Sequence, residues 1–342
     1  MTWWNAFRTL KLPQLRVGQL VEVRSAAEIL ATLDERGELD SLPFMPEMLQ
    51  FCGKRLTVDK VAHKLCDMIT EARGMYWMTN AVHLTGTRCD GVAHGGCQTG
   101  CTLYWKEAWL KPVSSDTPSA TEHLKINVPA KIAEMERATR KAPGPDGEER
   151  YSCQATELLR AAPERMGFLD LRQYVIDLRS GNVTLWPLLR TFFFGLFNRF
   201  QSKSRRILPE SMRIKGGLHW GWVQGSDISQ TPTVKLDLQP GDLVRIKSKD
   251  EIVKTINAKR FNRGLGFEEE MAWHCGATAR VARRVDRCID DRTGRLLSMQ
   301  NPCIVLDGII CEGVYNRNCP RAFLPFWREI WLERIDEPTP GR

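Results

Sequence analysis

The stretch Cys89-Asp-Gly-Val-Ala-His-Gly-Gly-Cys97-Gln-Thr-Gly-Cys101 holds three cysteines and a histidine within thirteen residues. A second stretch, Cys311-Glu-Gly-Val-Tyr-Asn-Arg-Asn-Cys319, matches it at a shift of 222 positions. Similar tails follow, Trp105-Lys-Glu-Ala-Trp109 in one case and Trp327-Arg-Glu-Ile-Trp331 in the other. We call residues 89–101 the first cysteine loop and residues 311–319 the second cysteine loop. Their similarity decides how the rest of the chain is divided.

The similarity continues upstream of both loops. Gly18-Gln-Leu-Val-Glu-Val matches Gly241-Asp-Leu-Val-Arg-Ile at a shift of 223, and one deletion then moves the register to 222. The further identities at the shift of 223 place Ser25, Glu28, Ile29, Leu42, Phe44, Glu47, Met48, Cys52, Gly53 and Val58 on Ser248, Glu251, Ile252, Leu265, Phe267, Glu270, Met271, Cys275, Gly276 and Val281. So many matches at a nearly fixed offset indicate an internal duplication. We call the two copies the first repeat and the second repeat.

The phrase Pro240-Gly-Asp-Leu-Val-Arg-Ile resembles the first strand of SH3-like barrels, such as the small barrels of the nitrile hydratase β-subunit type. Short strand-like runs separated by glycine and proline turns fit that class. The resemblance implies an α+β protein with two duplicated SH3-like β-barrel domains joined by a mostly helical middle region. The expected boundaries are 15–113 for the first barrel, 114–235 for the middle and 236–336 for the second barrel. A fold of this kind does not by itself imply a function.

Composition narrows the class of protein. Hydrophobic residues make up 42% of the chain and charged residues 26%, as in a soluble globular protein. The N-terminus does not have the pattern of a secretory signal. The eleven cysteines are therefore expected to be reduced in the cytoplasm, where clustered cysteines bind metal more often than they form disulfides. The net charge of +8 predicts an acidic partner, which is nucleic acid, an anionic membrane surface or an anionic small molecule.

The cysteines are the candidate metal ligands, because a thiolate suits zinc and iron–sulfur clusters. Three cysteine positions are shared by the repeats, and shared retention favours ligands over core filler. The predicted ligands are Cys52, Cys89, Cys97 and Cys101 in the first repeat and Cys275, Cys303, Cys311 and Cys319 in the second. His94 and Cys153 are alternative ligands for the first site, and His94 is also a candidate acid–base group.

The spacing of the cysteines indicates which kind of metal centre to expect. There is no Cys-x2-Cys knuckle of the usual zinc modules, and Cys319 is followed by Pro320, a pairing frequent beside iron–sulfur clusters. We therefore expect a cytoplasmic metalloprotein with cysteine-ligated centres, iron–sulfur before zinc, acting in redox or small-molecule chemistry. The alternatives are a nucleic-acid-binding adaptor with structural zinc sites and a protein-interaction scaffold with free thiols. Whether the protein is an enzyme stays open, because no phosphate loop, hydrolase elbow or zinc-protease motif is present.

Two aromatic features have structural interpretations. The tryptophans that follow the cysteine loops are expected to pack the end of each repeat onto its core. The apolar run 184–200 is expected to be a core helix, and contact of residues 184–206 with a membrane surface is its alternative because Lys203, Arg205 and Arg206 follow directly. It is too short for a transmembrane span and contains Arg190 and Arg199.

Overall fold

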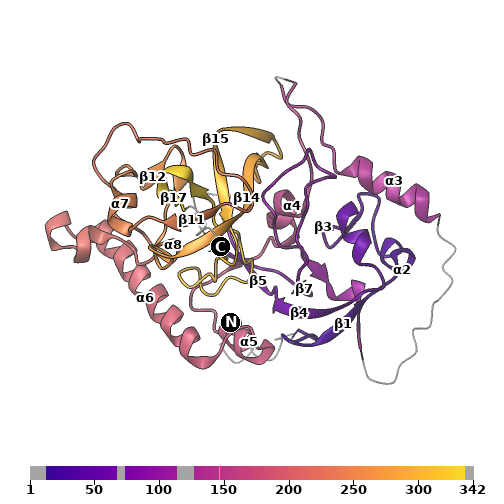
Figure 1. The fold of residues 1–342 in the computed structure, drawn as a ribbon. Helices are drawn as coiled ribbons and strands as arrows, with labels where there is room; N and C mark the ends of the chain where they lie inside the picture. The colour runs from indigo at the N-terminus through magenta and orange to yellow at the C-terminus, as the bar shows by residue number, and fades with distance from the viewer. Residues whose placement is uncertain (1–12, 68–73, 114–126, 146, 336–342) are drawn as a thin grey trace, which may run out of the picture. The chain divides into compact units, whose positions relative to one another are not determined.

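The computed structural model describes residues 13–67, 74–113, 127–145 and 147–335 (Figure 1). The chain forms two compact units. The first unit comprises the chain up to Leu188 together with Cys288–Leu297 and Cys319–Arg321. The second unit comprises Leu189–Arg287, Ser298–Asn318 and the chain from Ala322 onward. Short segments from the C-terminal part of the sequence therefore belong to the first unit.

The first unit is built on a five-stranded antiparallel sheet of order β8-β7-β4-β1-β9. Its strands are β1 (Leu20–Val23), β4 (Arg55–Val61), β7 (Ala81–Leu84), β8 (Trp105–Lys106) and β9 (Leu110–Pro112). A three-stranded sheet of order β10-β6-β5 lies in the same unit, with β5 (Lys64–Cys66), β6 (Met75–Trp77) and β10 (Arg165–Met166). The remaining elements of the first repeat are α2 (Ala26–Leu30), β2 (Glu38–Leu39), β3 (Leu42–Pro43), and the 3-10 helices η1 (Pro46–Phe51) and η2 (Glu107–Trp109).

The second repeat has a sheet of the same design, in the order β16-β15-β14-β11-β17. Its strands are β11 (Leu243–Ile246), β14 (Thr278–Ile289), β15 (Leu296–Leu306), β16 (Trp327–Arg328) and β17 (Leu332–Arg334). The accompanying elements are α7 (Lys249–Val253), β12 (Phe261–Asn262), β13 (Leu265–Gly266), α8 (Glu269–Ala272) and η5 (Glu329–Trp331). When each strand is matched to its counterpart, the two sheets have identical orders, as the internal duplication predicts.

Local details repeat as well. In both α2 and α7 the N-cap serine and the glutamate three residues later form a capping box. Trp109 Nε1 donates a hydrogen bond to Thr32 Oγ1 at 3.0 Å, and Trp331 Nε1 donates to Thr255 Oγ1 at 2.8 Å. All four tryptophans of the two tails are fully buried, so their predicted packing role is confirmed. Replacing one of them with alanine would cost about 3–5 kcal/mol of folding free energy.

The middle of the chain supplies helices to both units. The helices are α3 (Val128–Ala138), α4 (Gln154–Ala161), α5 (Arg172–Ser180), α6 (Leu185–Ile207), and the 3-10 helices η3 (Glu210–Met212) and η4 (Ile214–Gly217). Helix α4 is joined to the first repeat by Gln154, whose Nε2 donates to the carbonyls of Pro43 and Tyr104, both at 2.9 Å. The first residues of the predicted middle region, 114–126, lie outside the described residues. Among the helices that the structure describes, none is long and apolar enough to cross a membrane.

The architecture is thus a mixed α/β fold with several antiparallel sheets. Within the described residues none of these sheets closes into a barrel. The predicted combination of helices and sheets agrees with the structure, whereas the SH3-like barrels stay a prediction.

Candidate metal centre

The first cysteine loop is a tight backbone enclosure in the first unit. Its ends are held together by the Cys89 N–H, which donates to the Cys101 carbonyl at 2.8 Å. Inside it, the carbonyl of Gly91 accepts hydrogen bonds from the N–H groups of His94 and Gly96 at 3.1 and 2.9 Å. Gly91 has a φ of 75°, and a Cβ there would lie 1.8 Å from the Cys97 carbonyl oxygen. Only glycine fits this position, because both the backbone conformation and the space exclude a side chain.

Three side chains converge at this loop. The ligand atoms of Glu47, Cys89 and His94 all lie within 4.8 Å of one another, and Cys89 Sγ is 3.2 Å from His94 Nε2. Their side chains are exposed by only 7%, 8% and 1%. Glu47 comes from η1, and Cys89 and His94 come from the loop itself. Among the described residues this is the one group of three or more ligand side chains that meets so closely.

Three polar atoms of this triad lack an ordinary hydrogen-bond partner. Among the described residues, neither carboxylate oxygen of Glu47 has a hydrogen-bond partner of ordinary geometry, and neither does His94 Nδ1. Leaving such atoms buried costs about 1–3 kcal/mol each. Burial raises the pKa of Glu47, and burial together with the Glu47 carboxylate raises the pKa of the Cys89 thiol. A cation between these groups would offset the repulsion that keeps them protonated.

His94 is already in the form that binds metal. Burial lowers its pKa to about 4, so its imidazole is neutral at physiological pH. Thr139 at the end of α3 holds the loop beside it by donating from Oγ1 to the Ala93 carbonyl at 2.9 Å. The residue after His94, Gly95, lies against Tyr151, whose ring would be 2.7 Å from a Cβ at that position. The histidine is therefore fixed from both sides by elements of the middle region.

Two further thiols interact electrostatically with the Cys89 thiol. Cys101 and Cys153 interact electrostatically with Cys89 and with each other. Burial raises the pKa of both, to about 12 for Cys153 at the N-cap of α4. Cys97 instead packs in a small apolar cluster with Tyr151 and Ile289. Cys101 and Cys153 are therefore the thiols available as a fourth ligand.

The cysteine pattern of the sequence predicted Cys52 as a ligand and did not indicate Glu47. Cys52 lies at the C-terminal end of η1, half-buried against the core of the first repeat, and burial raises its pKa to about 11. The same short helix presents Glu47, not Cys52, to Cys89. The sequence does contain a signal for Glu47, because Glu47 and Glu270 are identical at matched positions of the two repeats. That signal is not visible when only cysteines are compared.

The second repeat uses the equivalent glutamate differently. Glu270 Oε1 accepts hydrogen bonds from the backbone N–H groups of Glu312 and Gly313, the latter at 3.2 Å. The position of His94 is occupied by Asn316. The carboxylate of Glu47 therefore lacks hydrogen-bond partners of ordinary geometry, whereas the carboxylate of its counterpart Glu270 is bound by the backbone of the second cysteine loop.

The predicted ligands of the second repeat are dispersed. Cys303 lies in β15, where its Sγ accepts a hydrogen bond from Arg328 at 3.4 Å. Cys311 begins its loop, and its N–H donates to the Phe323 carbonyl at 2.7 Å. Cys275 is half-buried just after α8, and Cys319 belongs to the first unit. In the described part of the chain, no three of these four cysteines place their sulfurs within 4.8 Å of one another.

Cys319 forms a separate thiol pair in the first unit. Its Sγ accepts a hydrogen bond from the Cys66 N–H at 3.1 Å, and buried Arg321 donates from Nη1 to the Cys66 carbonyl at 3.2 Å. Burial opposes ionisation of Cys319, but the hydrogen bonds from Cys66 and the charge of Arg321 outweigh it and lower its pKa to about 7. Cys319 is therefore partly a thiolate at neutral pH.

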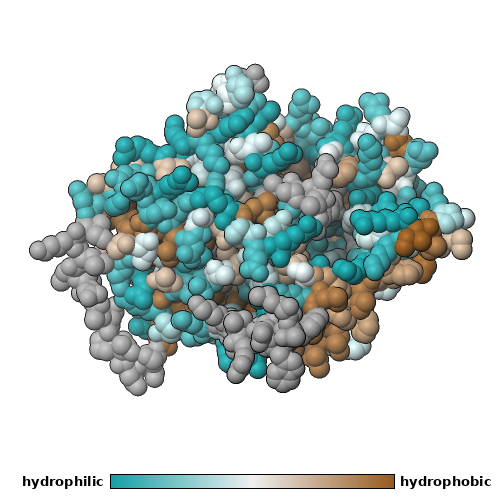
Figure 2. All heavy atoms as spheres, turned by 180° about the vertical axis from the view of Figure 1, so that it is seen from behind, coloured by the Kyte–Doolittle hydropathy of each residue, from teal (hydrophilic) through white to brown (hydrophobic). Residues whose placement is uncertain are grey.

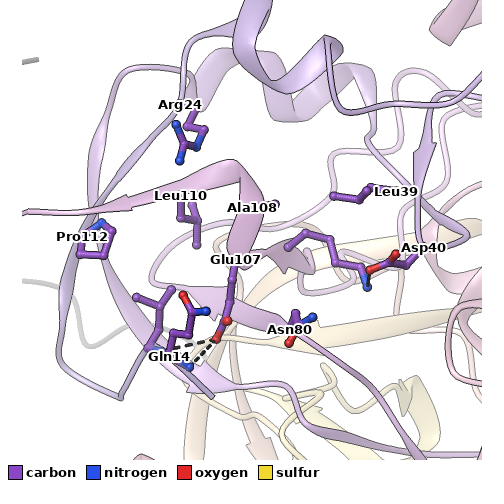
Figure 3. Close-up of a pocket in the computed structure, with 11 residues that line it drawn as sticks. Gln14, Arg24, Leu39, Asp40, Asn80, Glu107, Ala108, Leu110 and Pro112 are labelled. Atoms are coloured by element: carbon purple, nitrogen blue, oxygen red, sulfur yellow. Dashed lines mark hydrogen bonds and ion pairs between the residues drawn. The ribbon is translucent and has the colours of Figure 1, made fainter. Parts of the chain in front are cut away.

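The first unit also has a pocket of about 680 Å³, which Figure 3 shows in close-up. At its wall Glu107 Oε1 accepts hydrogen bonds from the backbone of Gln14 and Leu15 at 3.1 and 3.4 Å. Glu329, the counterpart of Glu107, accepts backbone hydrogen bonds from Leu236 and Leu238 in the same way. Because both repeats contain this arrangement, we interpret Glu107 as part of the framework. None of the three triad residues lines the pocket.

Comparisons with models of protein families, with curated proteins and with solved structures give no match for this chain. The case for the candidate metal centre therefore rests on its own geometry.

Proposed function

We propose that the protein binds a transition-metal ion in the first cysteine loop, with Cys89, His94 and Glu47 as ligands. The observation that carries the proposal is the approach of these three side chains to within 4.8 Å, with the Glu47 oxygens and His94 Nδ1 left without partners. Native proteins seldom bury several polar atoms together without satisfying them. A bound cation supplies the missing partner for the carboxylate and displaces the thiol proton of Cys89.

The donor set favours zinc. A thiolate, an imidazole and a carboxylate are the three kinds of ligand that zinc accepts, usually in a tetrahedral site. Cys101 or Cys153 would complete four ligands. An iron–sulfur cluster instead takes four cysteines, or two histidines in one subclass, and a carboxylate is outside that pattern. Iron–sulfur, the first expectation from the sequence, becomes the alternative.

The burial of the ligands distinguishes a structural role of the metal ion from a catalytic one. A catalytic zinc keeps one coordination position open to water or substrate, whereas a structural zinc is closed by four protein ligands. All three triad side chains are less than a tenth exposed, and the thiols of Cys101 and Cys153 interact electrostatically with Cys89. We therefore assign the ion a structural role, in which it fixes the loop and joins η1 to it, rather than redox or small-molecule chemistry.

We also propose that each repeat has an SH3-like fold. Each five-stranded sheet has a meander of strands whose last strand returns beside the first, preceded by a single 3-10 turn. This arrangement supports the SH3-like assignment of both repeats, with the metal loop as an insertion between the third and fourth strands of the sheet.

The experiment is metal analysis of the full-length chain, purified without a metal-affinity tag and in the absence of oxygen, together with its visible spectrum. We expect about one zinc per chain and no visible colour. Cys89→Ser should lose the metal, whereas the matched variant Cys311→Ser in the second cysteine loop should retain it.

Other outcomes would overturn the proposal. A brown protein containing iron and sulfide would replace the mixed-ligand site by a cluster. Equal loss of metal from Cys89→Ser and Cys311→Ser would show that the assignment to the first loop is wrong. A protein that takes up neither metal after supplementation with zinc and iron would remove the metal centre altogether.

A further inference from the structure

Helix α6 has one face that is anchored to the second unit. Thr191 Oγ1 donates a hydrogen bond to Asn318 Oδ1 at 2.9 Å. Phe194 and Phe197 pack on Trp220 with ring centroids 5.1 and 4.1 Å apart, and Gln201 donates to two backbone carbonyls. These residues lie on one side of the helix. The contacts that fold α6 onto its unit are therefore made by this inner face.

The opposite face is apolar and exposed. Trp186, Phe193 and Ile207 expose 76%, 61% and 78% of their surface. The other exposed apolar residues of the helix are Leu185, Leu189, Leu196 and Phe200. At 3.6 residues per turn the seven side chains occupy roughly 100° of the helix circumference. Figure 2 shows a hydrophobic patch at its lower right, in the region of α6.

This face is larger than folding requires. Single exposed hydrophobic side chains are ordinary, but a contiguous stripe on one helix marks an interaction site. The inner face already provides the packing that holds α6 in place. The outer face is therefore available for contact with a partner.

Charge identifies the kind of partner. Helix α6 has no aspartate or glutamate, and its five charged residues are all basic: Arg190, Arg199, Lys203, Arg205 and Arg206. On the helix circumference Arg190 lies beyond one edge of the apolar stripe, whereas Arg199 and Arg206 lie beyond the other. An apolar stripe with tryptophan and phenylalanine, bordered by arginine and lysine, is the pattern of helices that lie in the interface of a membrane.

We propose that α6 docks on the surface of an anionic lipid bilayer, with its outer face among the acyl chains nearest the headgroups and its basic residues among the phosphates. The long aliphatic stems of arginine and lysine reach from the stripe to the headgroups. A second copy of the chain fits less well, because joining two such faces would bring their basic borders together. The helix lies on the bilayer and does not cross it.

The test is flotation of the full chain with vesicles of phosphatidylcholine alone or of phosphatidylcholine and phosphatidylserine in equal parts. We expect binding to the anionic vesicles, weakened by salt, and little binding to the neutral ones. Phe193→Ser combined with Phe200→Ser should reduce binding by at least about a hundredfold, since each buried phenylalanine contributes about tenfold or more. Arg199→Gln and Lys203→Gln should each reduce it about fivefold.

Leu169→Ser provides the matched control, because Leu169 is an exposed apolar residue outside α6. It should bind vesicles like the wild type. Equal binding of the double variant and the wild type to anionic vesicles would overturn the proposal. So would an absence of binding by the wild type, or a wild-type dimer in sedimentation that Phe193→Ser dissociates, which would assign the face to a second copy. Thermal unfolding unchanged from wild type verifies that each variant is folded.

Discussion

The two repeats place the same glutamate in two different environments. Glu270 accepts hydrogen bonds from the backbone of the second cysteine loop, whereas Glu47 faces a thiol and an imidazole with no hydrogen-bond partner of ordinary geometry among the described residues. The sheets, capping boxes and buried tryptophans around them are alike. The framework is therefore common to both repeats, and the difference lies in the loop that meets the carboxylate. Under the proposed function, the same glutamate accepts backbone hydrogen bonds in one copy and binds metal in the other.

The largest loss of stability is expected from replacing the glycine that closes a cysteine loop. Gly91 and Gly313 have φ values of 75° and 70°, and each carbonyl accepts two backbone hydrogen bonds within its loop. Gly91→Ala places a methyl group against the Cys97 carbonyl and should cost more than about 3 kcal/mol in the first unit, with loss of the metal.

Gly96→Ala is the control for Gly91→Ala. Gly96 has a φ of 70° but nothing within 4 Å of an added Cβ, so backbone strain alone should cost about 1 kcal/mol. Thermal unfolding and metal content measure both variants. Equal losses in the two would show that the loop is not closed as tightly as the Gly91 contact requires.

The two glutamates should respond in opposite directions to the same substitution. In the metal-free protein, Glu270→Gln weakens hydrogen bonds to a charged acceptor and should lower the free energy of unfolding by about 1–2 kcal/mol. Glu47→Gln removes a buried carboxylate without partners and should leave stability unchanged or raise it by up to about 1 kcal/mol. Added zinc should stabilise the wild type and Glu270→Gln but not Glu47→Gln.

Chemical denaturation with and without zinc distinguishes these cases. A loss of metal-free stability in Glu47→Gln as large as that in Glu270→Gln would mean that Glu47 has a hydrogen-bonding role like its counterpart.

A smaller effect is expected from the one buried histidine of β7, which makes stability depend on pH, whereas β15 has a valine at the matched position. His83 is fully buried in β7 with its Nδ1 2.9 Å from the Leu103 carbonyl, and Val305 occupies the equivalent position. Burial lowers the pKa of His83 to about 4, below its ordinary value of 6.5. Between these pH values the histidine takes up a proton in the unfolded chain but not in the folded chain. The contribution of neutral His83 to the free energy of unfolding is therefore fully present above about pH 6.5 and is lost as the pH falls toward 4.

His83→Val should therefore reduce the loss of stability between pH 6.5 and pH 4, measured as the free energy of unfolding against pH. Other buried histidines keep part of the dependence, because burial also lowers the pKa of His63. The prediction fails if the wild type and the variant show the same slope.

Much of the framework could be predicted from the sequence. The internal matches at shifts of 222 and 223 predicted two sheets of one design, and the matched pairs Ser25–Glu28 and Ser248–Glu251 both form capping boxes in the structure. These features depend on residues close together in the chain or on the pattern repeated within it. The tryptophan tails were also interpreted correctly, because large aromatic residues in equivalent places are most often core.

The candidate site was only partly predictable. The sequence identified Cys89 and His94 because they lie five residues apart in one loop. Glu47 is 42 residues upstream of Cys89, and only the packing of η1 brings its carboxylate to the loop. Cys319 was grouped with the second repeat by its register, but it belongs to the first unit and contacts Cys66.

The sequence by itself therefore determined the repeated framework, the closed glycine loop and the set of chemically capable side chains. Tertiary structure alone decided which of those side chains meet, because a ligand set depends on distances between atoms far apart in the chain. It also decided that the aromatic residues of α6 divide between two faces. Phe194 and Phe197 pack on Trp220, whereas Phe193 and Phe200 face outward, since a helix separates neighbouring residues by about 100°.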